Sequence, residues 1–164
     1  MFILDVEGFE RENFKFVCKE ISILDTSSDV HHHIFVKSPV NIDSLSYKIS
    51  NYIRWYRKNV NGLDWENPWL EDDLNTITYE NITQFIKQVI LDEPVYVRDC
   101  NIKNWLRELI TNEIINLKEE GCIPVLDLKN IFKSHHCLSH SDNNLSCTSE
   151  NVHNLHRWLL YCKK

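Results

Sequence analysis

Glycine and proline are scarce in this chain, with three and four copies among 164 residues. That scarcity excludes collagen-like, linker-like and low-complexity chains, and no shift in composition marks a domain boundary. No apolar run approaches the roughly 18 residues that a membrane-spanning helix needs. Basic residues are outnumbered too, since 18 lysines and arginines stand against 24 aspartates and glutamates. The net charge of −6 argues against a protein that holds nucleic acid by bulk positive charge.

The chain also lacks the marks of an exported protein. Its first four residues are apolar but lead directly to Asp5 and Glu7, without the basic region that opens a signal peptide. We therefore expect an intracellular protein with no membrane anchor, whose six cysteines are reduced. An apolar content of 43% with 26% charged residues fits one globular domain over residues 1–164, large enough to bury a core.

Two carboxylates spaced by one residue stand in the apolar run of residues 2–8. Side chains at i and i+2 share a face of a strand, so Asp5 and Glu7 are expected to project together from a buried element. Two like charges this close repel and are costly to desolvate unless a cation compensates them. A divalent metal ion is the commonest compensation. The alternative is a solvent-exposed edge strand.

Hydrophobic periodicity predicts an α/β fold. Strands are expected at 2–8, 16–24, 32–36 and 95–97, and helices over 45–60, 82–90, 102–110 and 152–161. Residues 114–117 form a fifth strand or prolong the preceding helix, and 126–132 are expected as a helical turn. The result is a mixed sheet with helices on its faces, with an antiparallel three-stranded start and a βαβ finish. This is the element order of the RNase H-like fold, whose first strand supplies metal-binding carboxylates.

A second set of potential ligands lies near the C-terminus. Cys137 and His140 have the C-x-x-H spacing that lets one turn present two ligands to one ion, and Cys147 follows as a third. Thiolate and imidazole ligands suit Zn²⁺, although an isolated C-x-x-H also arises by chance. The three histidines at 31–33 are interpreted as a polar strand entry, with metal binding as the alternative.

The sequence resembles two related families at these positions. Asp5-Val6-Glu7-Gly8, then Lys19-Glu20-Ile21, then Cys137-x-x-His140 and Cys147 before an amphipathic helix, look like the DEDD-type exonuclease domain of arenavirus nucleoproteins and the Maelstrom domain. Both families have an RNase H-like fold with a structural zinc bound by a Glu-Cys-His-Cys set. The resemblance implies that Zn²⁺ is held by Glu20, Cys137, His140 and Cys147.

The predicted second strand agrees in part with that implication. Glu20 stands in the middle of it, a costly place for a lone carboxylate unless it is paired or bound to metal. Cys18 is the rival ligand, because i and i+2 place it on the same strand face as Glu20.

The exonucleases that the chain resembles use four carboxylates to hold two metal ions and a histidine to activate water. Asp5 and Glu7 match the first pair. Asp99, just after the strand at 95–97, is the third candidate, with a helix N-cap as the alternative. Ser146 stands in place of the histidine and Asn151 in place of the fourth aspartate. The expected catalytic set is Asp5, Glu7, Asp99 and Asn151, with Mg²⁺ or Mn²⁺ if the chain is active.

Two functions therefore stay open. One is a metal-dependent 3′–5′ exonuclease, or another hydrolase, that acts on RNA or single-stranded DNA through a weakened two-metal site. The other is a catalytically degenerate RNase H-like module that binds RNA or a protein partner. Residues 54–58 interleave basic and aromatic side chains, a composition that stacks bases and meets phosphates, unless they form a solvated helix face. The candidate nucleic-acid ligands are Arg54, Trp55, Arg57 and Lys58.

Overall fold

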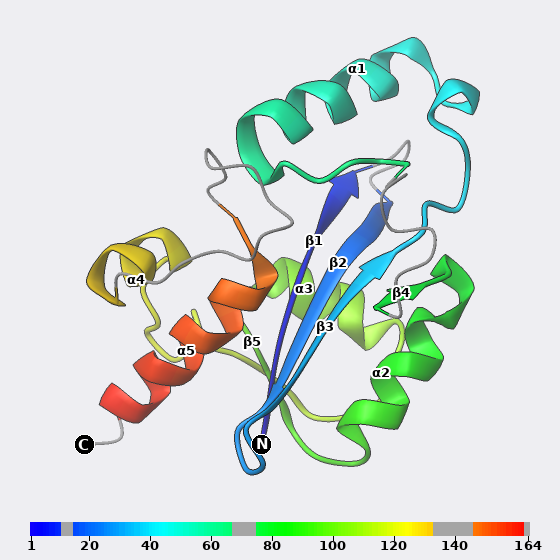
Figure 1. The fold of residues 1–164 in the computed structure, drawn as a ribbon. Coiled ribbons are helices and arrows are strands. Elements are labelled where there is room, and N and C mark those ends of the chain that lie inside the picture. The colour runs from blue at the N-terminus through cyan, green and yellow to red at the C-terminus, as the bar shows by residue number, and fades with distance from the viewer. Residues whose placement is uncertain (11–14, 67–74, 133–145, 163–164) are drawn as a thin grey trace.

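The computed structural model of the chain is an α/β fold built on one mixed sheet (Figure 1). It describes residues 1–10, 15–66, 75–132 and 146–162. The strands are β1 (Phe2–Glu10), β2 (Phe16–Asp25), β3 (Val30–Val36), β4 (Thr76–Ile77), β5 (Val95–Val97) and β6 (Ile114–Asn116). The helices are α1 (Tyr47–Tyr56), α2 (Ile82–Ile90), α3 (Cys100–Arg107), α4 (Val125–Phe132) and α5 (Thr148–Cys162), with short turns η2 (Ile42–Ser44), η3 (Arg57–Asn61) and η5 (Tyr79–Asn81).

The sheet places β1 in its interior, in the strand order β4-β3-β2-β1-β5-β6. The first three strands are antiparallel to one another in sequence order, whereas β5 runs parallel to β1 and β6 runs parallel to β5. This arrangement confirms the predicted α/β class and is compatible with an RNase H-like mixed sheet. Asp5 and Glu7 therefore lie on a strand that has neighbours on both sides, and the edge-strand alternative is wrong.

Most predicted elements form close to their expected bounds, and the differences have local causes. Residues 114–116 form a strand, and α4 is a helix of eight residues. Strand β4 was not predicted, because a two-residue strand is too short to show a period. Helix α1 ends at Tyr56 and a wider helical turn continues to Asn61, where Gly62 adopts a φ of 64° that ends the helix. Within the described ranges, no helix is long and apolar enough to cross a lipid bilayer.

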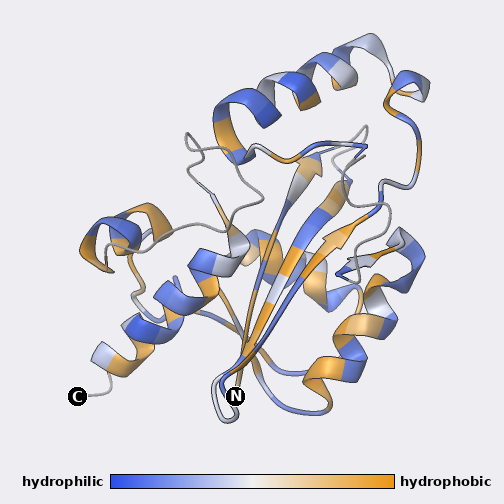
Figure 2. Cartoon of the chain, viewed as in Figure 1, coloured by the Kyte–Doolittle hydropathy of each residue, from blue (hydrophilic) through white to orange (hydrophobic). Residues whose placement is uncertain are grey.

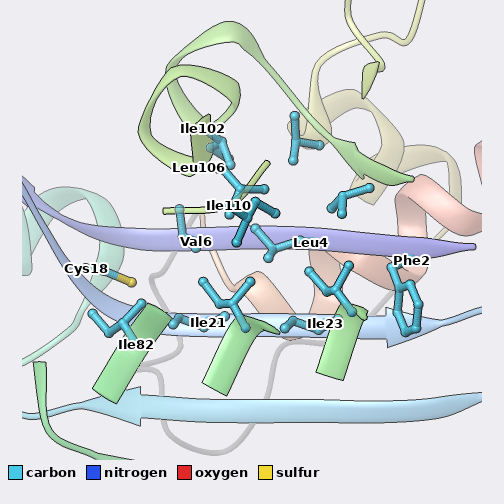
Figure 3. Close-up of a cluster of buried hydrophobic side chains, with 14 of the residues drawn as sticks. Phe2, Leu4, Val6, Cys18, Ile21, Ile23, Ile82, Ile102, Leu106 and Ile110 are labelled. Carbon is cyan, nitrogen blue, oxygen red and sulfur yellow. The ribbon is translucent and has the colours of Figure 1, made fainter. Parts of the chain in front are cut away.

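Alternate residues of β1 enter different layers of the core. Phe2, Leu4 and Val6 pack under α2 and α3 in the largest apolar cluster (Figure 3). Ile3 points the other way, toward α4 and α5, and Phe9 joins a third cluster that α1 covers. Figure 2 shows hydrophobic and hydrophilic residues alternating along α2 and α5, as expected for helices with one face on a sheet.

A β-bulge interrupts the ladder between β1 and β2. Glu7 pairs with Glu20, but Gly8 pairs with Cys18, so Lys19 is an extra residue on β2. Because of this extra residue, the side chains of β2 that precede Lys19 point to the opposite face of the sheet from the one that a regular strand would give them. Cys18 accordingly lies in the apolar cluster under α2 and α3 (Figure 3), on the face opposite Glu20. The prediction that Cys18 shares a face with Glu20 is therefore wrong, and Cys18 is no rival as a ligand.

Glycine is required at position 8 by the close approach of the two strands. A Cβ on Gly8 would lie 2.0 Å from the carbonyl oxygen of Val17, a distance that no side chain tolerates. The predicted strand was expected to end at this glycine. It runs on to Glu10 instead, because Gly8 marks a bulge and not a turn.

The extra residue of the bulge, Lys19, is fully buried. Its ammonium donates to Val36 O at 2.6 Å, to Ser38 Oγ at 2.9 Å and to Trp65 O at 2.8 Å. Three acceptors match the three protons of the group, so the buried charge is compensated. Burial nevertheless lowers the pKa of Lys19 to about 8. The end of β3 and the segment after α1 are thereby tied to the bulge.

Candidate functional site

Polar side chains gather on the α5 face of the sheet, beside the bulge. Asp5 and Glu7 project from β1, Asp99 follows β5 at the start of α3, and Asn151 lies in the first turns of α5. Asp5 has no exposed surface, Glu7 is 6% exposed and Asn151 is 4% exposed. The chain thus places buried acids where an apolar core would otherwise continue.

The side chain at the centre of this group is Arg98, which stands between β5 and α3. Its Nε lies 3.2 Å from Asp5 Oδ1 and 3.4 Å from Asp99 Oδ2. Its Nη2 lies 2.9 Å from Glu7 Oε1 and donates to Val6 O at 3.4 Å. One guanidinium therefore forms ion pairs with all three carboxylates, a geometry for which its planar fork of donors is suited.

The start of α5 adds two hydrogen-bond donors. Asn151 Nδ2 donates to Asp5 Oδ2 at 2.7 Å, and Ser146 Oγ donates to Glu7 Oε1. An ionised carboxylate only accepts, so the amide nitrogen of Asn151 faces Asp5 and its oxygen does not. The four predicted catalytic positions and Ser146 do come together. Ser146 and Asn151 act there as neutral donors to the acids.

Burial dominates the electrostatics of the group. It raises the pKa of Asp5 to about 7, against the opposing effect of Arg98. Burial also disfavours the charge on Arg98, yet Asp5, Glu7 and Asp99 together raise the pKa of Arg98 above its usual value. Asp5 Oδ1 accepts no hydrogen bond from the described residues, so the ion pair with Arg98 is its compensation.

Asp99 is the N-cap of α3, one of the two roles that the sequence left open, and it also faces the acidic group. Its Oδ1 accepts hydrogen bonds from Asn101 N at 2.9 Å and Ile102 N at 3.1 Å, which makes Asp99 the N-cap of α3. Its Oδ2 faces Arg98. Capping thus leaves one carboxylate oxygen directed at the acidic group.

This acidic group does not fit a pair of divalent metal ions in the conformation described. The fourth carboxylate is absent at Asn151, and the guanidinium of Arg98 lies among the other three. Across residues 1–10, 15–66, 75–132 and 146–162, no three histidine, cysteine, aspartate or glutamate side chains are arranged to hold a metal ion.

A cleft of about 780 Å³ opens beside Glu7, Arg98 and Asp99. Aromatic side chains from β2, α1, η5 and α3 share its lining, and Phe16 meets Trp105 edge to face with ring centroids 5.8 Å apart. The aromatic residues of the lining are Phe16, Tyr52, Tyr56, Tyr79 and Trp105. A second cavity, of about 240 Å³, also includes Arg98 and Asp99 in its lining. Arg98 therefore borders two open spaces.

The predicted nucleic-acid ligands of α1 and η3 lie outside the lining of this cleft. Arg54 and Lys58 are exposed, as is Trp55 with 58% of its surface accessible. Arg57 forms a two-point ion pair with Asp64, with Nε 2.8 Å from Oδ1 and Nη2 3.1 Å from Oδ2. Its side chain stays 53% exposed, and its contact with phosphates remains a prediction.

Two of the four predicted zinc ligands fall within the described residues. Glu20 and Cys147 are both buried, whereas Cys137 and His140 lie outside the described ranges. A hydrogen bond of 2.8 Å between Ser22 Oγ and Thr148 Oγ1 joins β2 to the start of α5. It places the residue that follows Cys147 against β2, two positions along the strand from Glu20.

Glu20 contacts a cluster of histidines on β3. His33 Nε2 lies 2.6 Å from Glu20 Oε1. The ring of His31 stacks on that of His33 with centroids 6.0 Å apart, and it meets His153 of α5 at 4.9 Å. Burial, followed by the neighbouring histidines, lowers the pKa of His31 to about 4. His31 is therefore neutral at neutral pH, and His153 of α5 is one of the histidines that lower its pKa.

Sequence reasoning missed Arg98 and the aromatic lining. The position of Arg98 in the sequence was the available signal. It stands between a buried strand and the predicted ligand Asp99, where a long side chain can fold back toward the end of the strand. No family model matches the chain, and no match is found among curated proteins or solved structures. The site is accordingly interpreted from its geometry.

Proposed function

We propose that this chain is an RNase H-like module, related to DEDD-type 3′–5′ exonucleases, that binds single-stranded nucleic acid and is catalytically degenerate. The observation that carries the proposal is the cleft, whose lining joins nuclease-type acids to five aromatic side chains. Unpaired bases of RNA or single-stranded DNA expose faces for stacking, and each stacked base contributes about 1–3 kcal/mol. A duplex hides those faces.

The charge of the lining shapes the expected mode of binding. Four acids, Glu7, Glu10, Asp99 and Glu108, share the lining with two basic residues, Lys15 and Arg98. Few phosphate contacts can form there, and the salt dependence of affinity scales with the number of phosphates that are neutralised. We therefore expect binding by base stacking, with a weak salt dependence.

The degenerate character follows from the side chains that replace the base and the fourth acid. A general base contributes about 10² to 10⁴ in rate, and the hydroxyl of Ser146 cannot serve as one at neutral pH. Asn151 brings no charge and donates to Asp5. The second candidate function, a weakened exonuclease, is favoured by one observation, the grouping of Asp5, Glu7 and Asp99 around one guanidinium.

Fluorescence anisotropy with labelled single-stranded RNA and DNA of about 12 nucleotides tests the proposal, with a duplex as reference and no added Mg²⁺ or Mn²⁺. Tyr52→Ala removes a ring of the cleft, and Trp55→Ala on the same helix is the matched control outside it. We expect Tyr52→Ala to weaken single-strand binding about tenfold and Trp55→Ala to leave it unchanged. Circular dichroism confirms that both variants fold.

Other results would point to a different binding surface or a different function. Loss of binding in Trp55→Ala alone would move the interface to the predicted patch on α1. No binding to any nucleic acid would contradict the proposal and favour a protein partner. Rapid degradation of RNA with Mg²⁺ or Mn²⁺, abolished by Asp5→Ala, would establish the exonuclease instead.

A structural zinc is the second part of the proposal. Glu20 and Cys147 would hold the ion together with Cys137 and His140, as the resemblance implies. The burial of Glu20 and Cys147 at the contact between β2 and the start of α5 supports this ligand set. Zinc would fix the segment before α5 and, with it, the donors Ser146 and Asn151.

A further inference from the structure

The acidic group of this chain already contains a cation, which is a side chain. Arg98 reaches Asp5, Glu7 and Asp99 at 3.2, 2.9 and 3.4 Å, so its guanidinium fills the space that a shared metal ion would take. We propose that Arg98 is a built-in counter-cation that keeps a latent divalent-metal site closed, and that one ion binds there when the guanidinium leaves. This inference rests on the degenerate site of the proposed function and not on nucleic-acid binding.

The carboxylates need a cation whether or not Arg98 supplies it. Asp5 has no exposed surface, and the amide of Asn151 hydrogen-bonds one of its two oxygens. Glu7 receives the Ser146 hydroxyl and the Arg98 guanidinium on the same oxygen, Oε1. Without the guanidinium, the two buried carboxylates would keep only neutral donors among the described residues, so they would have to take up a proton or another cation. Carboxylate oxygens are the ligands that Mn²⁺ and Mg²⁺ prefer, so a divalent ion is the natural replacement.

The surroundings of Arg98 give the side chain somewhere to go. It lines both the 780 Å³ cleft and the 240 Å³ cavity. The cleft also presents Glu10 and Glu108 together with aromatic faces, to which a guanidinium binds through charge and cation–π contacts. Apart from Asp99, which lines both spaces, the cavity offers Lys118 and mainly apolar side chains, which do not attract a cation. The open conformation therefore directs Arg98 into the cleft.

The composition of the group limits its capacity to one ion. Asp5, Glu7 and the free oxygen of Asp99 provide three carboxylates, and the position of a fourth is occupied by Asn151. Within residues 1–10, 15–66, 75–132 and 146–162, a second divalent ion would lack a charged ligand of its own. The acids thus hold one cation at a time: the Arg98 guanidinium in the closed state and one divalent ion in the open state.

Isothermal titration and electron paramagnetic resonance with Mn²⁺ alone test this inference without any activity assay. Arg98→Ala should bind one Mn²⁺ about ten- to a hundredfold more tightly than wild type. Arg98→Lys should fall between them, because an ammonium cannot bridge three carboxylates. The double variant Arg98→Ala/Asp5→Asn should lose the gain, and Arg107→Ala, which removes an exposed arginine of α3, is the matched control.

Thermal melting gives an independent readout. Arg98→Ala should melt below wild type in buffer without added Mg²⁺ or Mn²⁺, and Mn²⁺ should raise its melting temperature while leaving wild type unchanged. The inference is overturned if Arg98→Ala gains no Mn²⁺ affinity, if it stays insoluble with and without Mn²⁺, or if wild type binds two ions tightly. A gain of Mn²⁺ binding without any RNA or DNA binding would support this inference and remove the nucleic-acid proposal alone.

Discussion

The two faces of β1 are equally buried but differ in chemistry. Toward α2 and α3, Phe2, Leu4 and Val6 form a continuous apolar row. Toward α5, Asp5 and Glu7 occupy the corresponding places. An apolar face is stabilised by the area it removes from water and tolerates many side chains of similar volume. A buried polar face is stabilised only by specific partners, and each lost partner leaves an uncompensated charge.

Apart from Arg98, the polar partners come from one segment of the chain. Ser146, Thr148 and Asn151, at and before the start of α5, each bond a side chain of the sheet. The polar face thus depends on how the segment before α5 is held. The apolar face depends on α2 and α3, which pack by shape.

Loss of the proposed zinc should destabilise the protein most strongly, because the polar face of β1 depends on the segment that zinc would hold. Cys147→Ser removes a proposed ligand and should give insoluble or unfolded protein that contains no zinc, because structural zinc contributes about 10–16 kcal/mol to folding in small zinc domains. Elemental analysis and circular dichroism are the measurements, with exposed Cys100→Ser as the control. Wild-type protein that is purified without zinc, or a Cys147→Ser variant as stable as wild type, would remove the zinc site.

A cavity in the apolar face should have the next largest effect. Leu4 is fully buried, so Leu4→Ala should lower the free energy of unfolding by about 2–5 kcal/mol in urea denaturation. Exposed Leu160→Ala should change it by less than about 0.5 kcal/mol. A small loss at Leu4 would show that the apolar face is not tightly packed.

The hydrogen bond between Ser22 and Thr148 should have the smallest of the three effects. Ser22→Ala and Thr148→Val should each lower the free energy of unfolding by about 1–3 kcal/mol, because each leaves its partner buried and unsatisfied. The double variant should lose less than the sum of the two. Additive losses in this cycle would indicate that α5 is not held through this pair.

The apolar face was predictable from the sequence in nearly all respects. Its side chains recur at the periods of strands and helices, and those periods gave the bounds of the long elements. The positions of Asp5, Glu7 and Asn151 in one group also agree with the prediction. The resemblance and the strand period were enough to predict this grouping, because both indicate the path of the backbone.

The rest depends on features that leave no period in the sequence. The extra residue Lys19 falls between two strand segments that are both buried, so nothing in the pattern reveals the shift that moves Cys18. The direction of Arg98 is decided by three charges contributed from β1 and α3. A long side chain after a short strand can extend toward solvent or fold back, and only the assembled charges decide.

The buried ammonium of Lys19 closes a loop without a covalent bond. Ser38 and Trp65 stand at the two ends of the excursion that contains α1, and both accept from this one cation. Closing a flexible loop costs entropy that grows only slowly with its length, so one compensated buried charge can set the base of a long excursion. Helix α1 supplies Tyr52 and Tyr56 to the cleft, and Lys19 lies on the bulge opposite Gly8, next to Glu7. The aromatic side chains of α1 and the acidic group are therefore anchored at the same point of the sheet, where a single residue is inserted in β2.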